Sequence, residues 1–192
     1  MNGKINYGEI LQKAEQAFKF IQKNFYKEEC TGMFLQIAEL RTGARTVFGV
    51  EIGDIPLEKG DKYEQIAKKK IAMLYYLVKH RFIDSLQTQI IASKQLVDPT
   101  LNEWGGAIHS LGFFFSASGH TQKGDEALTI IAALEFSKQK NEQSFERALR
   151  NAHEVYRITP SDDEIGKLNE IIIAVVKEIY NIDLVDRFEF DE

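Results

Sequence analysis

Residues 105–120, which read GGAIHSLGFFFSASGH, decide the fold of this chain. Residues 110–112 make a tight connection between two apolar segments, so the stretch predicts a pair of strands. The second strand begins with three consecutive phenylalanines at 113–115, and a run that is apolar on both faces indicates the middle of a sheet. The polar residues 119–124 then predict a loop, and Asp125 is the expected N-cap of the helix that follows.

The segments before this stretch alternate between helical and extended patterns. Residues 7–26 carry apolar side chains at the i, i+3, i+4 and i+7 spacing of an amphipathic helix. Residues 31–40 and 45–52 are rich in strand formers and are separated by the short turn 41–44, so they predict an antiparallel hairpin. A second helix is expected to follow, with Asp61 as its N-cap.

The C-terminal third of the chain predicts three more helices. The first, at about residues 125–138, is apolar over most of its circumference, which indicates packing on more than one side. Residues 141–156 form the next, and Thr159-Pro160 opens the last. Its apolar stripe over residues 165–179 predicts a core-forming helix. The acidic tail after Asn181 is expected to fray.

The composition disfavours several classes of protein. The 192 residues suit one domain, or one domain with an appendage. A net charge of −5 disfavours nucleic acid as a partner, because binding phosphates needs a basic face. No apolar run reaches the roughly 20 residues of a membrane span, and the N-terminus has no signal-peptide pattern, so a cytoplasmic protein without a membrane partner is expected. The single cysteine, Cys30, is expected to be a core residue.

No motif in the sequence proves a chemistry. The four histidines are scattered, so no metal site is expected, and catalytic residues stay unassigned because neither a P-loop nor a nucleophile elbow is present. The lysine run 68–70 is expected to be a solvated helix face. Loop 119–124 is more suggestive, because it places backbone N–H groups, His120 and Lys123 at a helix N-terminus, where anions bind. The alternative is a plain polar connection.

The order of these motifs resembles the haem-degrading-domain family, which includes GlcG and HbpS. The matching motifs are Gly105-Gly106 before the strand pair, Ser118-Gly119 at the end of the buried strand, and Asp125-Glu126-Ala127 at the following helix. Lys70 matches a lysine that the family carries in its second helix. The resemblance covers roughly residues 7–136.

The two extra C-terminal helices, from Asn141 on, lie outside the family domain. For the rest of the chain, this resemblance implies an α+β fold with an antiparallel sheet of about five strands flanked by helices, profilin-like or PAS-like. It divides the chain into a GlcG/HbpS-like domain over residues 1–140 and a helical extension over 141–192, packed on the domain or on a partner subunit. It also implies a homo-oligomer that binds a small anionic ligand, with haem as a possible cofactor. The residues expected to form the ligand site are Lys70, Ser118, Gly119, His120, Lys123, Asp125 and Glu126.

Three functions remain open from the sequence. The first is a small-ligand-binding or haem-binding protein of the GlcG/HbpS type. The second is a non-catalytic interaction or assembly module that docks through the C-terminal helices. The third is a hydrolase or lyase that uses His120 with a carboxylate. Fold analogy cannot select among them, because one fold serves many functions.

Overall fold

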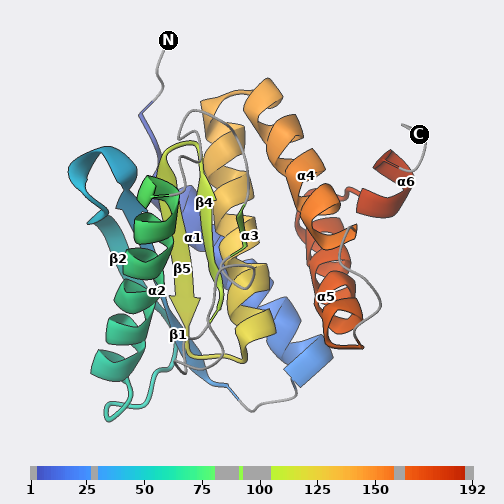
Figure 1. Cartoon of the computed structure of the whole chain (residues 1–192). Helices are drawn as coiled ribbons and strands as arrows, with labels where there is room; N and C mark the ends of the chain where they lie inside the picture. The colour runs from blue at the N-terminus through green and yellow to red at the C-terminus, as the bar shows by residue number, and fades with distance from the viewer. Residues whose placement is uncertain (1–3, 27–29, 81–90, 93–104, 158–162, 189–192) are drawn as a thin grey trace.

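An antiparallel sheet with helices on both faces forms the centre of the molecule (Figure 1). This computed structural model describes residues 4–26, 30–80, 91–92, 105–157 and 163–188. In chain order the elements are α1 (Tyr7–Ile21), the π-helical turn η1 (Gln22–Tyr26), β1 (Gly32–Glu39), the 3₁₀ turn η2 (Leu40–Thr42), β2 (Arg45–Gly53), α2 (Gly60–His80), β3 (Ile91–Ala92), β4 (Ala107–Ser110), β5 (Phe113–Ser118), α3 (Gln122–Lys140), α4 (Glu142–Arg157), α5 (Asp163–Tyr180) and α6 (Leu184–Phe188).

The sheet has the strand order β2-β1-β5-β4-β3, and each neighbouring pair is antiparallel. Four strands carry the sheet, because β3 contributes only two residues. β5 lies between β1 and β4, and the side chains of Phe114 and Phe115 are fully buried on its two faces. The predicted fold class, the hairpin and the central position of the phenylalanine strand are therefore confirmed. The sequence of residues 81–103 is hard to interpret, and within it residues 86–92 fit either a strand or the end of a helix. Residues 91–92 form the short strand β3, and the rest of this stretch lies outside the described ranges.

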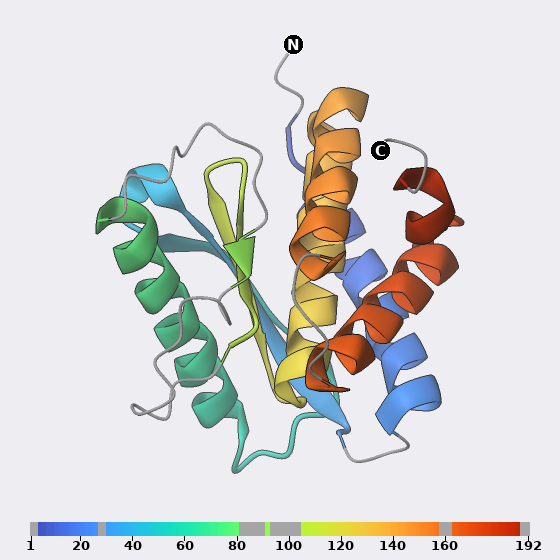
Figure 2. The ribbon, with the colours of Figure 1, turned by 45° about the vertical axis from the view of Figure 1, so that its right-hand side comes forward.

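The helices form unequal layers on the two faces of the sheet (Figure 2). Among the described elements, α2 is the helix that covers one face, where Ile71, Leu74 and Val78 pack around Phe114. α1 and α3 cover the other face, and α4 and α5 lie outside α3. All residues of α3 from 124 to 137 are buried, because the sheet, α1, α4 and α5 surround this helix. The prediction that this helix packs on more than one side is confirmed.

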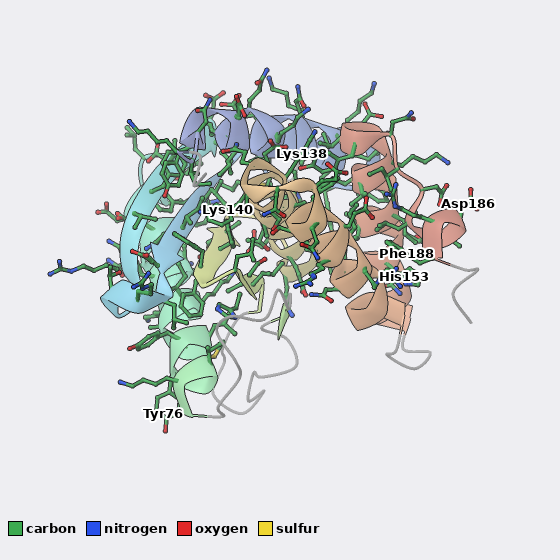
Figure 3. The ribbon with its side chains drawn as sticks, turned by 90° about the horizontal axis from the view of Figure 1, so that it is seen from above. Tyr76, Lys138, Lys140, His153, Asp186 and Phe188 are labelled. Carbon is green, nitrogen blue, oxygen red and sulfur yellow. The ribbon has the colours of Figure 1, made fainter. Side chains whose placement is uncertain are left out.

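The C-terminal helices complete the same apolar core. Ile171, Ile172, Val175 and Val176 of α5 are buried in one cluster with residues of α1 and α3. The expected fraying after Asn181 is wrong as far as residue 188, because α6 buries its two apolar ends, Leu184 and Phe188. Figure 3 shows His153 of α4 beside Phe188 of α6, with ring centroids 5.3 Å apart.

Two predicted helix caps are wrong, and so is one predicted solvated side chain. α2 begins at Gly60, so Asp61 lies in its first turn. α3 begins at Gln122 because Thr121 is the N-cap and its hydroxyl accepts the N–H of Gly124, which leaves Asp125 inside the helix. In the lysine run 68–70, the third lysine is only 3% exposed. The predicted start of the last helix at Thr159-Pro160 lies outside the described residues.

Replacing the buried His109 by phenylalanine is expected to stabilise the fold by about 1 kcal/mol. His109 is fully buried on β4, and neither ring nitrogen has a hydrogen-bond partner within the described ranges. Burial lowers its pKa to about 4, so the ring is neutral at pH 7. Phenylalanine keeps the ring packing on Phe114 and removes the unsatisfied nitrogens. Urea unfolding at pH 7 measures the effect, and His153→Phe is the control. A loss of stability in His109→Phe would contradict the prediction.

Candidate functional site

Three elements meet at a buried ion pair near the end of β5. The Lys70 ammonium on α2 lies 2.7 Å from Oδ2 of Asp125 on α3. It also donates a hydrogen bond of 2.6 Å to the backbone carbonyl of Ala117 on β5. The two charged side chains are only 3% and 5% exposed. The pair therefore ties both helix layers to the central strand, through charges that are costly to bury alone.

Two glycines allow close approaches of the chain in this region, Gly106 against the pair itself and Gly119 against the start of β1. Gly106 has φ +103°, and a Cβ there would lie 3.0 Å from the Cβ of Asp125 and 3.3 Å from the Lys70 ammonium. Gly119 has φ +140°, and a Cβ there would lie 2.7 Å from the Gly32 carbonyl oxygen. Both backbone conformations favour glycine. These glycines belong to two of the short motifs on which the family resemblance rests.

Asp125 uses both carboxylate oxygens within the protein. Oδ2 accepts from Lys70, and Oδ1 accepts the backbone N–H of His120 at 3.0 Å. Burial raises the pKa of Asp125 to about 6, while the Lys70 ammonium and the His120 N–H oppose that rise. At pH 7 the carboxylate is therefore mostly ionised and its charge is balanced by Lys70.

His120 is a neutral hydrogen-bond donor at this site. Its Nδ1 accepts the backbone N–H of Thr121 at 2.8 Å, which assigns the ring proton to Nε2. Nε2 is buried and has no hydrogen-bond partner among the residues the structure describes. Burial lowers the pKa of His120 to about 4. The ring is packed edge-on against Tyr26, with centroids 4.1 Å apart, and lies over Gly124, where a Cβ would come within 2.6 Å of Nδ1.

This environment does not fit iron ligation by His120. A metal binds the lone pair of an imidazole nitrogen. Here Nδ1 is already an acceptor, and Nε2 carries the proton. Ligation at Nε2 would move that proton to Nδ1, where it would face the Thr121 N–H. It would also require displacement of Tyr26 from the ring. The described residues around His120 therefore suit a hydrogen-bonded ligand better than a haem.

The other predicted ligand residues lie around the pair without bonding to it. Ser118 is buried at the last position of β5, and Glu126 is buried in α3. Lys123 is half-buried in the first turn of α3. The described hydrogen bonds join only Lys70, His120 and Asp125 to one another among the predicted site residues. The role of Ser118, Lys123 and Glu126 in ligand binding stays a prediction.

Cys30 and Tyr26 also contact this region, and the sequence did not mark either as a site residue. The Cys30 thiol is 3.1 Å from the carbonyl oxygens of both Gly32 and Gly119. Burial raises the pKa of this thiol, so it stays protonated at neutral pH and is no nucleophile. The expectation that Cys30 is a core residue is confirmed. Tyr26 comes from the π-helical turn after α1, and only the tertiary fold brings it to His120.

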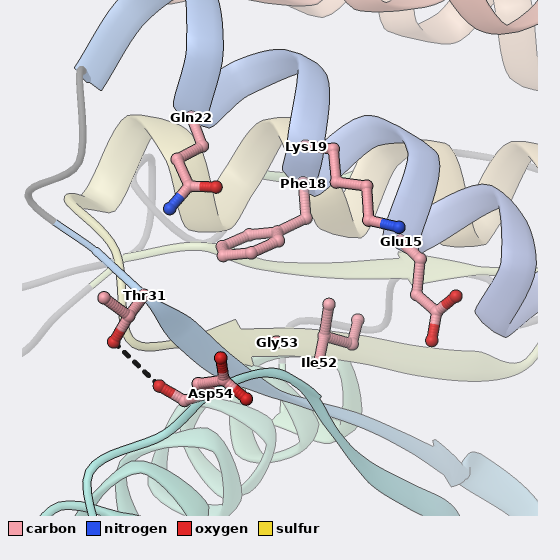
Figure 4. Close-up of a pocket in the computed structure, with 8 residues that line it drawn as sticks. All are labelled: Glu15, Phe18, Lys19, Gln22, Thr31, Ile52, Gly53 and Asp54. Atoms are coloured by element: carbon pink, nitrogen blue, oxygen red, sulfur yellow. Dashed lines mark hydrogen bonds between the residues drawn. The ribbon is translucent and has the colours of Figure 1, made fainter.

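A surface pocket of about 440 Å³ lies between the second half of α1 and the adjoining ends of β1 and β2 (Figure 4). This is the same end of the sheet, because Gly119 approaches the backbone of Gly32, and Asp54 donates its N–H to the Thr31 carbonyl oxygen. Its lining shares no residue with the Lys70–Asp125 pair. The two features are therefore separate candidate sites.

The comparisons with known proteins found no matching family model, curated protein or solved structure. Within the described ranges, no group of three or more histidine, cysteine, aspartate or glutamate side chains is arranged to hold a metal ion. No helix in those ranges combines the length and the apolar composition needed to cross a bilayer.

Proposed function

We propose that this chain is a cytoplasmic, homo-oligomeric, small-ligand-binding protein of the GlcG/HbpS type, and that its ligand is a small carboxylate bound beside Lys70 and His120. The observation that carries the proposal is the convergence of separate motifs. Lys70, Gly106, Ala117 beside the Ser118-Gly119 motif, and Asp125 come from separate parts of the sequence, yet they meet around one buried ammonium group.

The unused donors of the site favour an anion, although the charge of Lys70 is balanced by Asp125. An ammonium group has three N–H donors, and Lys70 uses two of them, on Ala117 and Asp125. His120 offers a second unused donor at Nε2. Lys70 and His120 are both hydrogen-bonded to the same Asp125 carboxylate, which fixes their positions. Hydrogen bonds between charged donors and a carboxylate are among the strong ones in proteins.

The packing of the C-terminal helices weighs against the docking-module alternative. That alternative needs an apolar helix face for a partner, and the four buried residues of α5, at positions 171, 172, 175 and 176, instead pack in one cluster with residues of α1 and α3 of the same chain. The hydrolase or lyase alternative needs His120 as a base. Its Nδ1 accepts from Thr121 and its Nε2 carries the proton, so no free lone pair is available for that role.

Calorimetric titration with acetate, pyruvate, succinate and haemin tests the proposal. We expect at least one small carboxylate to bind, and His120→Phe to weaken it several-fold, because this variant keeps the ring packing on Tyr26 and removes the Nε2 donor. His153→Phe, which removes an imidazole from α4, is the matched control and should bind like the wild type. Absence of binding by every carboxylate would overturn the proposal, as would equal binding by His120→Phe.

A further inference from the structure

The pocket between α1 and the ends of β1 and β2 is lined by one helical stripe, which runs from α1 into the first residue of η1, and by a facing strip of strand-end residues (Figure 4). The helix residues follow the i, i+3, i+4 and i+7 spacing that places side chains on one face. They are Glu15, Phe18, Lys19 and Gln22, and the facing residues are Thr31, Ile52, Gly53 and Asp54.

The walls of this pocket are held in place. Gly53 has φ +71°, and a Cβ there would lie 2.5 Å from the Thr31 carbonyl oxygen and 2.9 Å from the Phe18 ring. The Gln22 amide donates to the Cys30 carbonyl oxygen at 2.6 Å, and the Thr31 hydroxyl donates to the Asp54 carbonyl oxygen at 2.7 Å. These contacts fix the pocket before any ligand enters, which lowers the entropy cost of binding.

The ionised side chains around the pocket are not paired with one another. Within the described ranges, neither the Glu15 nor the Asp54 carboxylate has an ion-pair or side-chain hydrogen-bond partner, and Lys19 has no ion-pair partner. Two carboxylates and one ammonium leave the pocket with a formal charge of −1. Phe18 and Ile52 add an apolar floor, since both are almost fully buried.

We propose that this pocket binds a small organic cation with a primary ammonium group. Two unpaired carboxylates attract the ammonium, and the Phe18 ring favours a cation or an attached alkyl chain. A metal ion is a poorer occupant, because no group of three or more metal-ligating side chains lies here within the described residues. The pocket volume of about 440 Å³ falls in the range of small-ligand sites.

Titration of the full chain with n-butylamine, followed by NMR chemical shifts, tests this site. The expected result is saturable binding at one site, with shifts at Phe18, Gly53 and Asp54. n-Butanol, which carries the same alkyl chain but lacks the cation, should bind at least several-fold more weakly, as judged from the shifts at these same residues. Glu15→Gln and Asp54→Asn should each weaken butylamine binding about threefold, the range that single exposed charges contribute.

Glu58→Gln is the matched control, because it removes one negative charge from the same loop as Asp54 without lining the pocket. It should leave butylamine binding unchanged. Lys19→Gln removes the competing ammonium and should strengthen binding. Equal binding of butanol, equal weakening by Glu58→Gln, or no saturation would overturn the assignment. Glu15→Gln should bind the small carboxylates of the proposed Lys70–His120 site as tightly as the wild type does. A failure of the proposed amine pocket can therefore be told apart from a failure of the proposed carboxylate site.

Discussion

Truncation after Arg157 is expected to leave a protein that is unfolded or aggregated at 25 °C. The cut removes α5 and α6, and α5 buries Ile171, Ile172, Val175 and Val176 against α1 and α3. Full burial of an aliphatic side chain contributes roughly 1.5–3 kcal/mol, so these four contribute roughly 6–12 kcal/mol. That is comparable to the whole stability of a typical domain, roughly 5–15 kcal/mol. Exposed faces of α1 and α3 would then drive association.

Circular dichroism and size-exclusion chromatography with light scattering measure this outcome. The control is truncation after Phe188, which retains both buried ends of α6 and should match the full chain. A second variant, Val176→Ala, should retain the fold and lose about 1–2 kcal/mol, which links the effect to packing. A soluble truncation product with the oligomeric state and melting temperature of the full chain would contradict the prediction.

The sheet was predictable because its signals are local. The phenylalanine run 113–115, the connection 110–112 and the hairpin turn 41–44 each specify structure within a few residues of themselves. The confirmed strands β1, β2, β4 and β5 follow from those patterns. The short β3 could not be told from the end of a helix, because a short apolar run has no periodicity of its own and this strand depends on pairing with Ile108 and His109.

The site was predictable only in part. The lysine run 68–70 suggested a solvated face, although Lys70 shares the i, i+3, i+4 and i+7 stripe with Ala67, Ile71 and Leu74, which are all buried. Only the family resemblance drew attention to it. The pocket between α1 and the ends of β1 and β2 is not marked by any sequence motif. Glu15 and Asp54 look like ordinary exposed charges in the sequence, and only the pairing of β2 with β1 brings the lining residues together.

Breaking the Lys70–Asp125 pair from one side is expected to destabilise the fold by about 3–5 kcal/mol, because a buried charge is left without its partner. Lys70→Met leaves the Asp125 carboxylate alone, and Asp125→Asn leaves the Lys70 ammonium alone. The double variant Lys70→Met, Asp125→Asn removes both charges and keeps an oxygen that accepts the His120 N–H. It should recover most of the loss. Urea unfolding of the wild type and the three variants at pH 7 gives the coupling energy.

The pH dependence of these variants separates the two charges. Burial already raises the pKa of Asp125 from 3.8 to about 6 in the folded wild type, and loss of Lys70 removes an interaction that lowers it. A carboxyl group with a raised folded pKa favours folding most below its unfolded pKa, and this contribution is lost as the pH rises through the folded pKa. Lowering the pH from 8 to 5 should therefore stabilise the folded state of Lys70→Met more than it stabilises the folded state of Asp125→Asn. Identical pH profiles for the two single variants would contradict this reading of the pair.

The double variant also distinguishes a purely structural role of the Lys70–Asp125 pair from a role in ligand binding. If its charges serve only to join α2 and α3 to β5, the double variant should fold stably and still bind the carboxylate found for the wild type. If Lys70 donates to that ligand, the double variant should fold stably and bind it at least tenfold more weakly, because the positive charge and the free N–H are both lost. A stable fold is expected in either case, since a methionine and an asparagine would fill this buried space without the cost of desolvating two ions. We expect the second result for binding, because Lys70 keeps one N–H donor that neither Ala117 nor Asp125 uses.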